Sequence, residues 1–156
     1  MFTLRIPGYG ELEIEHVVFD YNGTLAVDGE LLPGVAEALE ELARLVTVHV
    51  LTADTFGLAA AQLKGVPCRL SILPPETQDK AKSAYVHTLG NAVTACVGNG
   101  RNDRLMLAAG RLGIAVLGGE GAAVETLSAA DIVVTDILSA LGLFTHPLRL
   151  TATLRS

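Results

Sequence analysis

The stretch VVFDYNGTLAVDG at residues 17–29 decides how the rest of the chain is interpreted. Asn22-Gly23 between apolar residues is a strong hairpin signal, because both residues tolerate the positive φ of a type I′ turn. However, Asp20 ends an apolar strand and Thr24 follows the turn. An acid at the carboxyl end of a strand, beside a tight turn and a hydroxyl, is also well placed to accept a phosphoryl group. These residues alone leave both interpretations open.

Short apolar runs alternate with amphipathic runs on either side of this stretch. We expect strands at residues 16–20, 46–51, 68–73, 92–98, 112–118 and 131–135, and helices at residues 35–45, 55–65, 79–90, 102–112, 121–129 and 136–144. Strands and helices that alternate with short connections predict an α/β fold, with a doubly wound, mostly parallel sheet covered on both faces. In such a sheet the ligand lies at the carboxyl ends of the strands.

The two ends of the chain have different patterns. Residues 1–15 alternate apolar and polar residues around PGYG, which predicts an antiparallel β-ribbon leading into a core at residues 16–146. Residues 26–34 predict a small flap. Residues 147–156 form a tail that we expect to be extended after Pro147.

Composition limits the class of protein. The 156 residues suit one domain, and 50% hydrophobic but only 4% aromatic residues predict a core of aliphatic side chains. A net charge of −6 without a basic cluster argues against a nucleic acid or an anionic membrane as partner. We find neither a signal peptide nor an apolar run long enough to span a membrane, so we predict a cytoplasmic location.

Cysteine and histidine do not indicate a metal cage. Cys68 and Cys96 lie in apolar segments that we interpret as buried strands, where a thiol is usually inert. The four histidines are scattered singly along the chain, and a lone histidine is more often structural than a ligand. The sequence therefore predicts no zinc site.

Polar residues gather where the predicted strands end. They are Asp20, Asn22, Gly23 and Thr24 after the first core strand, Thr52, Ala53 and Asp54 after the second, and Asn99, Gly100, Asn102 and Asp103 in the loop GNGRND. Lys80 opens a helix that could reach the same edge. Carboxylates, amides, hydroxyls and glycine-rich backbone suit Mg²⁺ and phosphate, and helices starting near Thr55 and Asn102 would direct N–H groups at an anion.

Each of these features has a simpler interpretation when taken alone. GNGRND can be a glycine-rich loop with a helix cap, Thr52 and Asp54 can cap the next helix, and Lys80 and Lys82 can be solvated. The functional interpretation depends on their coincidence at one edge of one sheet.

Several motifs resemble those of the haloacid dehalogenase (HAD) superfamily, and within it the phosphorylation domain of P-type ATPases. DYNGTLA at residues 20–26 is similar to the family's DKTGTLT, VLTADTFGLAA to its LTGD segment, and PPETQDKAK to its P-E-x-K stretch. CVGNGRNDRLMLAAGRLGIAVLGGEGAAVETLSAADIVV resembles the GDGxND run and its continuation. The resemblance covers residues 17–134 in the family's order. It implies a Rossmann-like fold without a cap, with no room for the ion sites or nucleotide-binding domain of the ATPases.

The resemblance also implies roles for individual residues. Asp20 would be the nucleophile that forms an aspartyl phosphate. Gly23, Thr24, Thr52, Ala53, Lys80 and Asn102 would bind the phosphoryl group, and Asp20, Asn22, Asn99 and Asp103 would hold Mg²⁺. Positioning and electrostatic stabilisation by such groups account for most of the catalysis of phosphoryl transfer.

Two positions depart from the family's pattern. Asn22 stands where its phosphatases usually carry the aspartate that acts as general acid and base, and Asn99 stands where relatives carry an aspartate ligand of Mg²⁺. A carboxamide brings neither the charge nor the proton chemistry of a carboxylate. Both asparagines precede glycine, a context prone to deamidation.

Three functions stay open from the sequence. The first is a slow Mg²⁺-dependent phosphohydrolase acting on a small phosphorylated substrate. The second is a weak or inactive relative that binds Mg²⁺, phosphate or a partner protein for regulation, and the third is an accessory domain of a membrane ATPase. We also expect self-association into a homo-oligomer, because the chain is apolar for its size and has no cap to shield the site.

Overall fold

The computed structural model describes residues 1–156, and a six-stranded sheet forms its centre. The strands are β3 (His16–Asp20), β6 (Thr47–Thr52), β7 (Arg69–Ile72), β8 (Thr94–Gly98), β9 (Leu112–Val116) and β10 (Ile132–Val134), in the order β10-β9-β8-β3-β6-β7. Every neighbouring pair is parallel. The predicted α/β fold class is confirmed, and the order of the strands reverses at β3, where a ligand site is expected.

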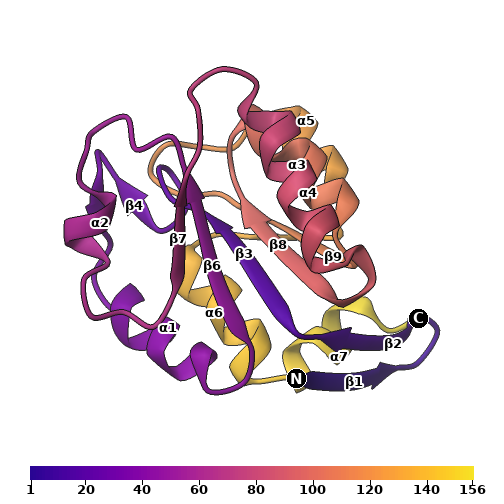
Figure 1. Cartoon of the computed structure of the whole chain (residues 1–156). Helices are drawn as coiled ribbons and strands as arrows, with labels where there is room; N and C mark the ends of the chain where they lie inside the picture. Colours follow the sequence, from indigo (N-terminus) through magenta and orange to yellow (C-terminus); the bar gives the residue numbers. More distant parts are fainter.

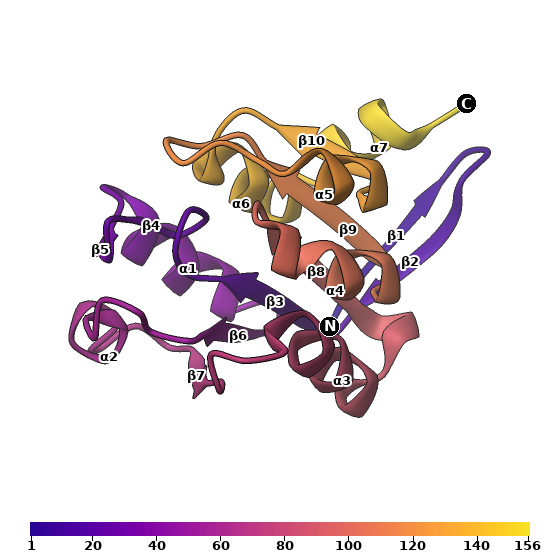
Figure 2. The same ribbon diagram turned by 90° about the horizontal axis from the view of Figure 1, so that it is seen from above.

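Helices cover both faces of the sheet. Helices α1 (Val35–Ala43) and α6 (Ile137–Thr145) pack together on one face, and α3 (Gln78–Leu89), α4 (Arg104–Ala109) and α5 (Val124–Ala129) on the other (Figures 1 and 2). Helix α1 turns Val35, Leu39 and Leu42 inward, at the spacing of one helical face. Both faces of the sheet are therefore buried, which explains the nearly continuous apolar runs of its strands.

Side chains of β3 alternate between the two layers. Val17 and Phe19 belong to the larger core cluster, on the side of α1 and α6, and Val18 belongs to the smaller one, on the side of α3 and α4. Since successive side chains of a strand point to opposite faces, Asp20 shares the face of Val18. The end of β3 thus directs its carboxylate toward α3.

The N-terminal ribbon and the C-terminal helix lie away from the carboxyl ends of the core strands (Figure 1). Strands β1 (Phe2–Ile6) and β2 (Gly10–Ile14) pair antiparallel, as expected. The predicted extended tail is wrong, because residues 148–154 form helix α7 (Leu148–Leu154), which packs against β1 and buries Leu150. Pro147 precedes the helix, where its missing N–H costs nothing. No helix is long and apolar enough to cross a membrane.

The turn after Asp20 is tight, but it is not the hairpin that Asn22-Gly23 suggested. Gly23 has a φ of +83°, whereas Asn22 keeps a negative φ, so the turn is not of type I′. The carbonyl of Tyr21 accepts hydrogen bonds from the N–H groups of Thr24, Leu25 and Ala26. The chain then enters a flap in which β4 (Ala26–Val27) and β5 (Glu30–Leu31) pair antiparallel.

The helix expected at residues 55–65 is much shorter than predicted. Helix α2 covers Ala59–Gln62 only. Asp54 and Gly57 both have positive φ, and the Asp54 carboxylate accepts a hydrogen bond from the N–H of Ala59. No helix therefore begins near Thr55, and the anion-binding helix start expected there is wrong.

Two of the histidines have a structural role beneath α3. His49 is fully buried, with Nε2 3.1 Å from Nδ1 of His16 and Nδ1 2.9 Å from the hydroxyl of Tyr85. Burial, together with the neighbouring His16 and Arg69, lowers the pKa of His49 to about 4. The ring is neutral near pH 7, and its nitrogens are used within the protein.

Tyr21 ties the flap to the end of β3. Its fully buried hydroxyl donates a 2.8 Å hydrogen bond to the carbonyl of Gly29 at the tip of the flap. We predict that Tyr21→Phe lowers the free energy of unfolding by about 1 to 2 kcal/mol, because this buried carbonyl loses its partner. Urea unfolding measures the change. Tyr9→Phe is the control, since the Tyr9 hydroxyl makes only a 3.3 Å contact with Arg111, and equal losses in both variants would contradict the prediction.

Candidate active site

A polar pocket of about 290 Å³ lies at the carboxyl ends of β3, β6 and β8. We call it the Asp20 pocket. Its lining residues are Asp20, Asn22, Thr52, Ala53, Thr55, Gln78, Asn99, Gly100, Asn102 and Glu120. The structure thus brings together seven residues that the sequence suggested: Asp20, Asn22, Thr52, Ala53, Asn99, Gly100 and Asn102. Gln78 and Glu120 are lining residues that sequence reasoning missed.

Asp20 lies at the floor of this pocket with both carboxylate oxygens engaged. It is 6% exposed. Its Oδ1 is 2.7 Å from the ammonium group of Lys82, and its Oδ2 is 3.1 Å from the hydroxyl of Thr24. The same hydroxyl lies 3.2 Å from Oδ1 of Asn99. Thr24, predicted to contact the phosphoryl group, instead holds these two side chains together from the buried side.

The lysine beside Asp20 is Lys82, not Lys80. Lys82 is fully buried, and its ammonium group lies 2.7 Å from both Asp20 and Asp103. Burial alone would lower the pKa of Lys82, but the charges of Asp20 and Asp103 outweigh it and raise the pKa above its ordinary value. Lys80 is exposed and makes no ion pair. The helical spacing of the sequence could have identified Lys82 as the inward-facing lysine, because it is one turn before the buried Val86 and lies on the same face of the helix.

Both carboxylate oxygens of Asp103 accept hydrogen bonds inside the protein, and its role as a metal ligand stays a prediction from the sequence. One carboxylate oxygen accepts from Lys82, and the other accepts from the N–H groups of Asn99 and Gly100 at 3.0 and 2.9 Å. The side chain is fully buried and does not line the pocket. Burial and the nearby Asp20 charge raise the pKa of Asp103, against the opposing effect of Lys82. Asp103 holds the loop after β8 and positions Lys82.

Glycine at position 23 allows the turn after β3 to meet the loop after β8. A Cβ atom at Gly23 would lie 2.4 Å from the amide nitrogen of Asn99, so no other residue fits there without displacing Asn99. The Asn99 amide also donates a 2.9 Å hydrogen bond to the carbonyl of Gly121. This bond fixes the side chain with its oxygen directed toward Thr24 and Asp20. Gly23 is thus needed for close approach rather than for direct phosphate binding.

The opposite wall supplies hydrogen-bond donors. The Thr52 hydroxyl accepts from the N–H of Asp54 at 2.9 Å, which leaves its own proton free for a ligand. Neither backbone nor side chain of the protein accepts from the N–H of Ala53. The Asn102 amide donates to Gln78 at 3.0 Å, which links this loop to α3. Thr52 and Ala53 are therefore the lining residues best placed to donate to an anion.

Asn22 presents an unpaired carboxamide to the pocket. Its Oδ1 atom is buried without a hydrogen-bond partner, the only such side-chain atom in the chain. A buried polar atom without a partner is rare in folded proteins and calls for an explanation. The protein thus leaves one polar atom of this lining residue without a partner.

The oxygens near Asp20 are of the kind that Mg²⁺ prefers. No group of three or more His, Cys, Asp or Glu side chains is arranged to hold a metal. The available donors are the Asp20 carboxylate, the Asn99 amide oxygen and the backbone carbonyl of Asn22. Such hard oxygen donors suit Mg²⁺, which commonly uses one or two carboxylates and completes its coordination with water and substrate phosphate.

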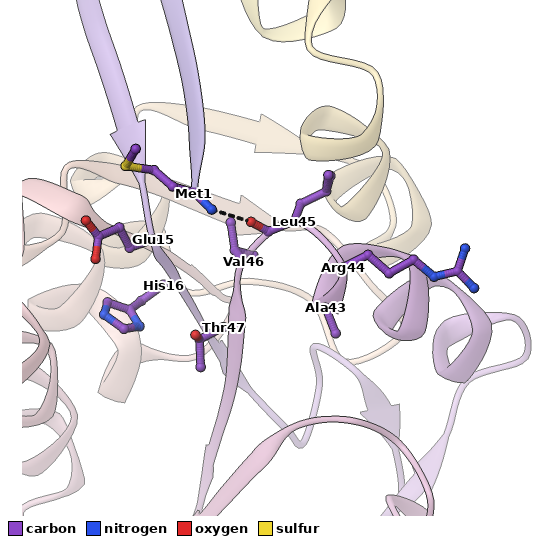
Figure 3. Close-up of a pocket in the computed structure, with 8 residues that line it drawn as sticks. All are labelled: Met1, Glu15, His16, Ala43, Arg44, Leu45, Val46 and Thr47. Atoms are coloured by element: carbon purple, nitrogen blue, oxygen red, sulfur yellow. Dashed lines mark hydrogen bonds between the residues drawn. The ribbon is translucent and has the colours of Figure 1, made fainter.

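A second hollow, of about 330 Å³, lies at the opposite end of β3 and β6. Figure 3 shows that Arg44 extends away from Glu15 and His16 there, and that the hydrogen bond drawn joins the N-terminal amine to the carbonyl of Leu45. No polar side chains converge in this hollow. The chemistry indicated by the sequence lies in the Asp20 pocket.

The buried ion pairs predict unequal effects of the two lysines. Lys82→Met leaves two buried carboxylates without their cation, and we expect the free energy of unfolding to fall by about 3 to 5 kcal/mol. Lys80→Met removes an exposed charge and should change it by no more than about 0.5 kcal/mol. Chemical denaturation of both variants measures the difference. Similar stabilities of the two variants would contradict the placement of Lys82.

Solved structures of phosphatases have the same fold. A cobalt-bound deoxy-D-mannose-octulosonate 8-phosphate phosphatase from Haemophilus influenzae matches 92% of this chain and 94% of its own, with 15% identity and a TM-score of 0.72. The 3-deoxy-D-manno-octulosonate 8-phosphate phosphatase of Moraxella catarrhalis, solved with magnesium, phosphate and KDO, matches 89% and 90%, with 14% identity and a TM-score of 0.71. A HAD superfamily phosphatase from Bacteroides thetaiotaomicron matches 91% and 96%, with 13% identity and a TM-score of 0.57.

Sequence comparison gives a shorter but stronger match. An uncharacterized protein of Methanocaldococcus jannaschii is 48% identical over 65 residues, which cover 42% of this chain and 70% of that protein. No protein-family model matches the chain. The chain belongs to the same family as this archaeal protein and has the fold of the haloacid dehalogenase superfamily.

Proposed function

We propose that this protein is a Mg²⁺-dependent phosphohydrolase that forms an aspartyl phosphate on Asp20. The observation that carries the proposal is the position of Asp20, at the floor of a polar pocket, with a buried lysine on one oxygen and a threonine hydroxyl on the other. These contacts hold the carboxylate in one orientation, and such positioning is the main requirement of phosphoryl transfer.

The residues around Asp20 have separate roles in the proposed reaction. A carboxylate oxygen of Asp20 attacks the phosphorus, while the Thr52 hydroxyl and the N–H of Ala53 donate to phosphoryl oxygens. Lys82 has no exposed surface and does not line the pocket, so it acts through Asp20 as a positioning residue. Bound Mg²⁺, held by Asp20, Asn99 and the Asn22 carbonyl, would neutralise negative charge on the transferred group.

The pocket favours a small, hydrophilic substrate. Its volume is about 290 Å³, and Ala53 is its only hydrophobic lining residue. The Moraxella neighbour contains phosphate and the sugar acid KDO, which is consistent with a polar phosphorylated substrate here. The β4–β5 flap is too short to enclose a ligand, so the pocket stays open to solvent. Self-association, which could shield the pocket, stays a prediction from the sequence.

A second candidate function is binding without efficient turnover. The amides of Asn22 and Asn99 favour it, since they leave Asp20 as the one carboxylate among the proposed metal ligands and remove the usual acid and base. Such a protein would bind Mg²⁺ and phosphate but hydrolyse esters very slowly. Measurements of binding and of turnover therefore have to be made on the same variants.

Asp20 is the first residue to test. We predict that Asp20→Asn abolishes p-nitrophenyl phosphate hydrolysis and the thermal stabilisation by beryllium fluoride with Mg²⁺, because an amide cannot form the acyl phosphate or its mimic. Glu40→Gln, at an exposed position of α1 on the other side of the sheet from α3, is the control and should keep both properties. Activity retained in Asp20→Asn, with its sequence verified by mass spectrometry, would refute the assignment.

Asn22 is the second residue to test. General acid and base help is worth about 10²- to 10⁴-fold, and Asn22 cannot supply it. We therefore predict that Asn22→Asp accelerates steady-state hydrolysis of p-nitrophenyl phosphate at saturating Mg²⁺, and that the unmodified protein accumulates an acid-stable phosphoenzyme. Peptide mass spectrometry must first show that Asn22 and Asn99 are not deamidated. If Asn22→Asp is no faster and neither protein is phosphorylated, the binding function is the better conclusion.

A further inference from the structure

Glu120 is a second carboxylate in the Asp20 pocket, and no motif assigned it a role. It lies in the loop between β9 and α5. Among the residues that line the pocket, only Asp20 and Glu120 are acidic, and none is basic. Asp20 is engaged by Lys82 and Thr24, whereas Glu120 makes no side-chain hydrogen bond or ion pair. Glu120 is thus the free carboxyl group of the pocket.

The loop that carries Glu120 is tied to the metal-binding side of the pocket. The next residue, Gly121, accepts a hydrogen bond from the Asn99 amide, and the N–H of Ala123 donates to the Asn99 carbonyl at 2.9 Å. On the other side, Gly118 lies near the Gly23 carbonyl, since an added Cβ would be in ordinary van der Waals contact with it at 3.4 Å. These contacts hold the Glu120 backbone beside the turn that carries Asn22.

Glu120 is the solvent-exposed acidic group of the pocket, and Asp20 is the buried one. Asp20 is 6% exposed, whereas Glu120 is an exposed residue that lines the same pocket. In phosphoryl transfer the attacking and leaving oxygens lie roughly in line through phosphorus. A leaving oxygen on the side of phosphorus away from the buried Asp20 therefore faces the solvent-accessible part of the pocket, whose lining includes the exposed Glu120.

The surrounding charges favour proton transfer by Glu120. Partial burial, followed by the negative charges of Asp28 in the flap and Asp20 at the end of β3, raises the pKa of Glu120. Two cations of neighbouring elements have other partners: Lys82 pairs with Asp20, and Arg101 on η2 (Arg101–Asp103) pairs with Glu125. A raised pKa is the direction that suits a glutamate to give and take a proton.

We propose that Glu120 transfers the proton that Asn22 cannot transfer; this inference rests on the proposed function. In the first step, Asp20 forms a bond to phosphorus, the bond from phosphorus to the leaving oxygen breaks, and that oxygen takes the proton of the Glu120 carboxyl group. In the second step, the Glu120 carboxylate takes a proton from water as the water oxygen bonds to phosphorus and the bond to Asp20 breaks. Inorganic phosphate leaves, and both carboxyl groups return to their initial state.

Glu120→Gln tests this role, because it keeps the shape of the side chain and removes its proton chemistry. We expect phosphoenzyme breakdown to slow by about 10²-fold, the lower end of general acid and base effects. Phosphoenzyme formation should slow more with phenyl phosphate than with p-nitrophenyl phosphate, since only the poorer leaving group needs a proton. A merely structural role would affect both substrates alike. Glu125→Gln, in an exposed ion pair on the neighbouring helix, is the matched control and should match the parent protein.

Introducing Glu120→Gln into the Asn22→Asp variant makes the test more specific. A carboxylate at position 22 should take over the proton transfer, so Glu120→Gln should then have little effect on either step.

The inference is contradicted if Glu120→Gln leaves phosphoenzyme breakdown unchanged, slows both substrates equally, or has the same effect in both backgrounds. A parent protein that hydrolyses neither substrate and forms no phosphoenzyme contradicts the proposed function, and this inference with it. A parent that is phosphorylated while Glu120→Gln behaves identically contradicts the inference alone.

Discussion

One buried ammonium group, that of Lys82, joins the ends of two central strands to the helix that covers them. It lies 2.7 Å from Asp20 after β3 and from Asp103 after β8. Burial of three charged groups is costly unless each is paired, so the arrangement persists only while all three stay in contact. The surroundings satisfy this condition, since Thr24 and the N–H groups of Asn99 and Gly100 pair the remaining carboxylate oxygens. The orientation of the Asp20 carboxylate follows from this network.

Two lining residues near Asp20 carry amides where phosphatases are expected to carry carboxylates. This difference bears on both metal binding and proton transfer in the pocket. Asn22 and Asn99 keep the shape of the residues expected in phosphatases but bring no negative charge and no titratable proton. In the proposed reaction, the metal site would therefore depend on Asp20 and on the substrate's own oxygens, and proton transfer on Glu120. A slow enzyme with a long-lived phosphoenzyme is what the proposal predicts.

Much of the fold and part of the site could be predicted from the sequence. Alternating apolar and amphipathic runs predicted the parallel sheet. Polar residues at the ends of the predicted strands identified four residues of the pocket, which are Asp20, Asn22, Thr52 and Asn99. The lysine was misassigned, because its identity depends on the phase of α3 against the sheet and not on its position after PPE. The short α2 and the helical tail depend on tertiary contacts, of Asp54 with Ala59 and of α7 with β1, which local patterns do not contain.

The claim that Asp20 accepts the phosphoryl group has a direct chemical test. Protein incubated with p-nitrophenyl phosphate and Mg²⁺ is quenched in acid and reduced with borohydride, which converts an aspartyl phosphate to homoserine. We predict homoserine at position 20 in the peptide spectrum, and none without substrate or in Asp20→Asn. Homoserine at another aspartate, or a phosphorylated protein with unmodified Asp20, would contradict the claim.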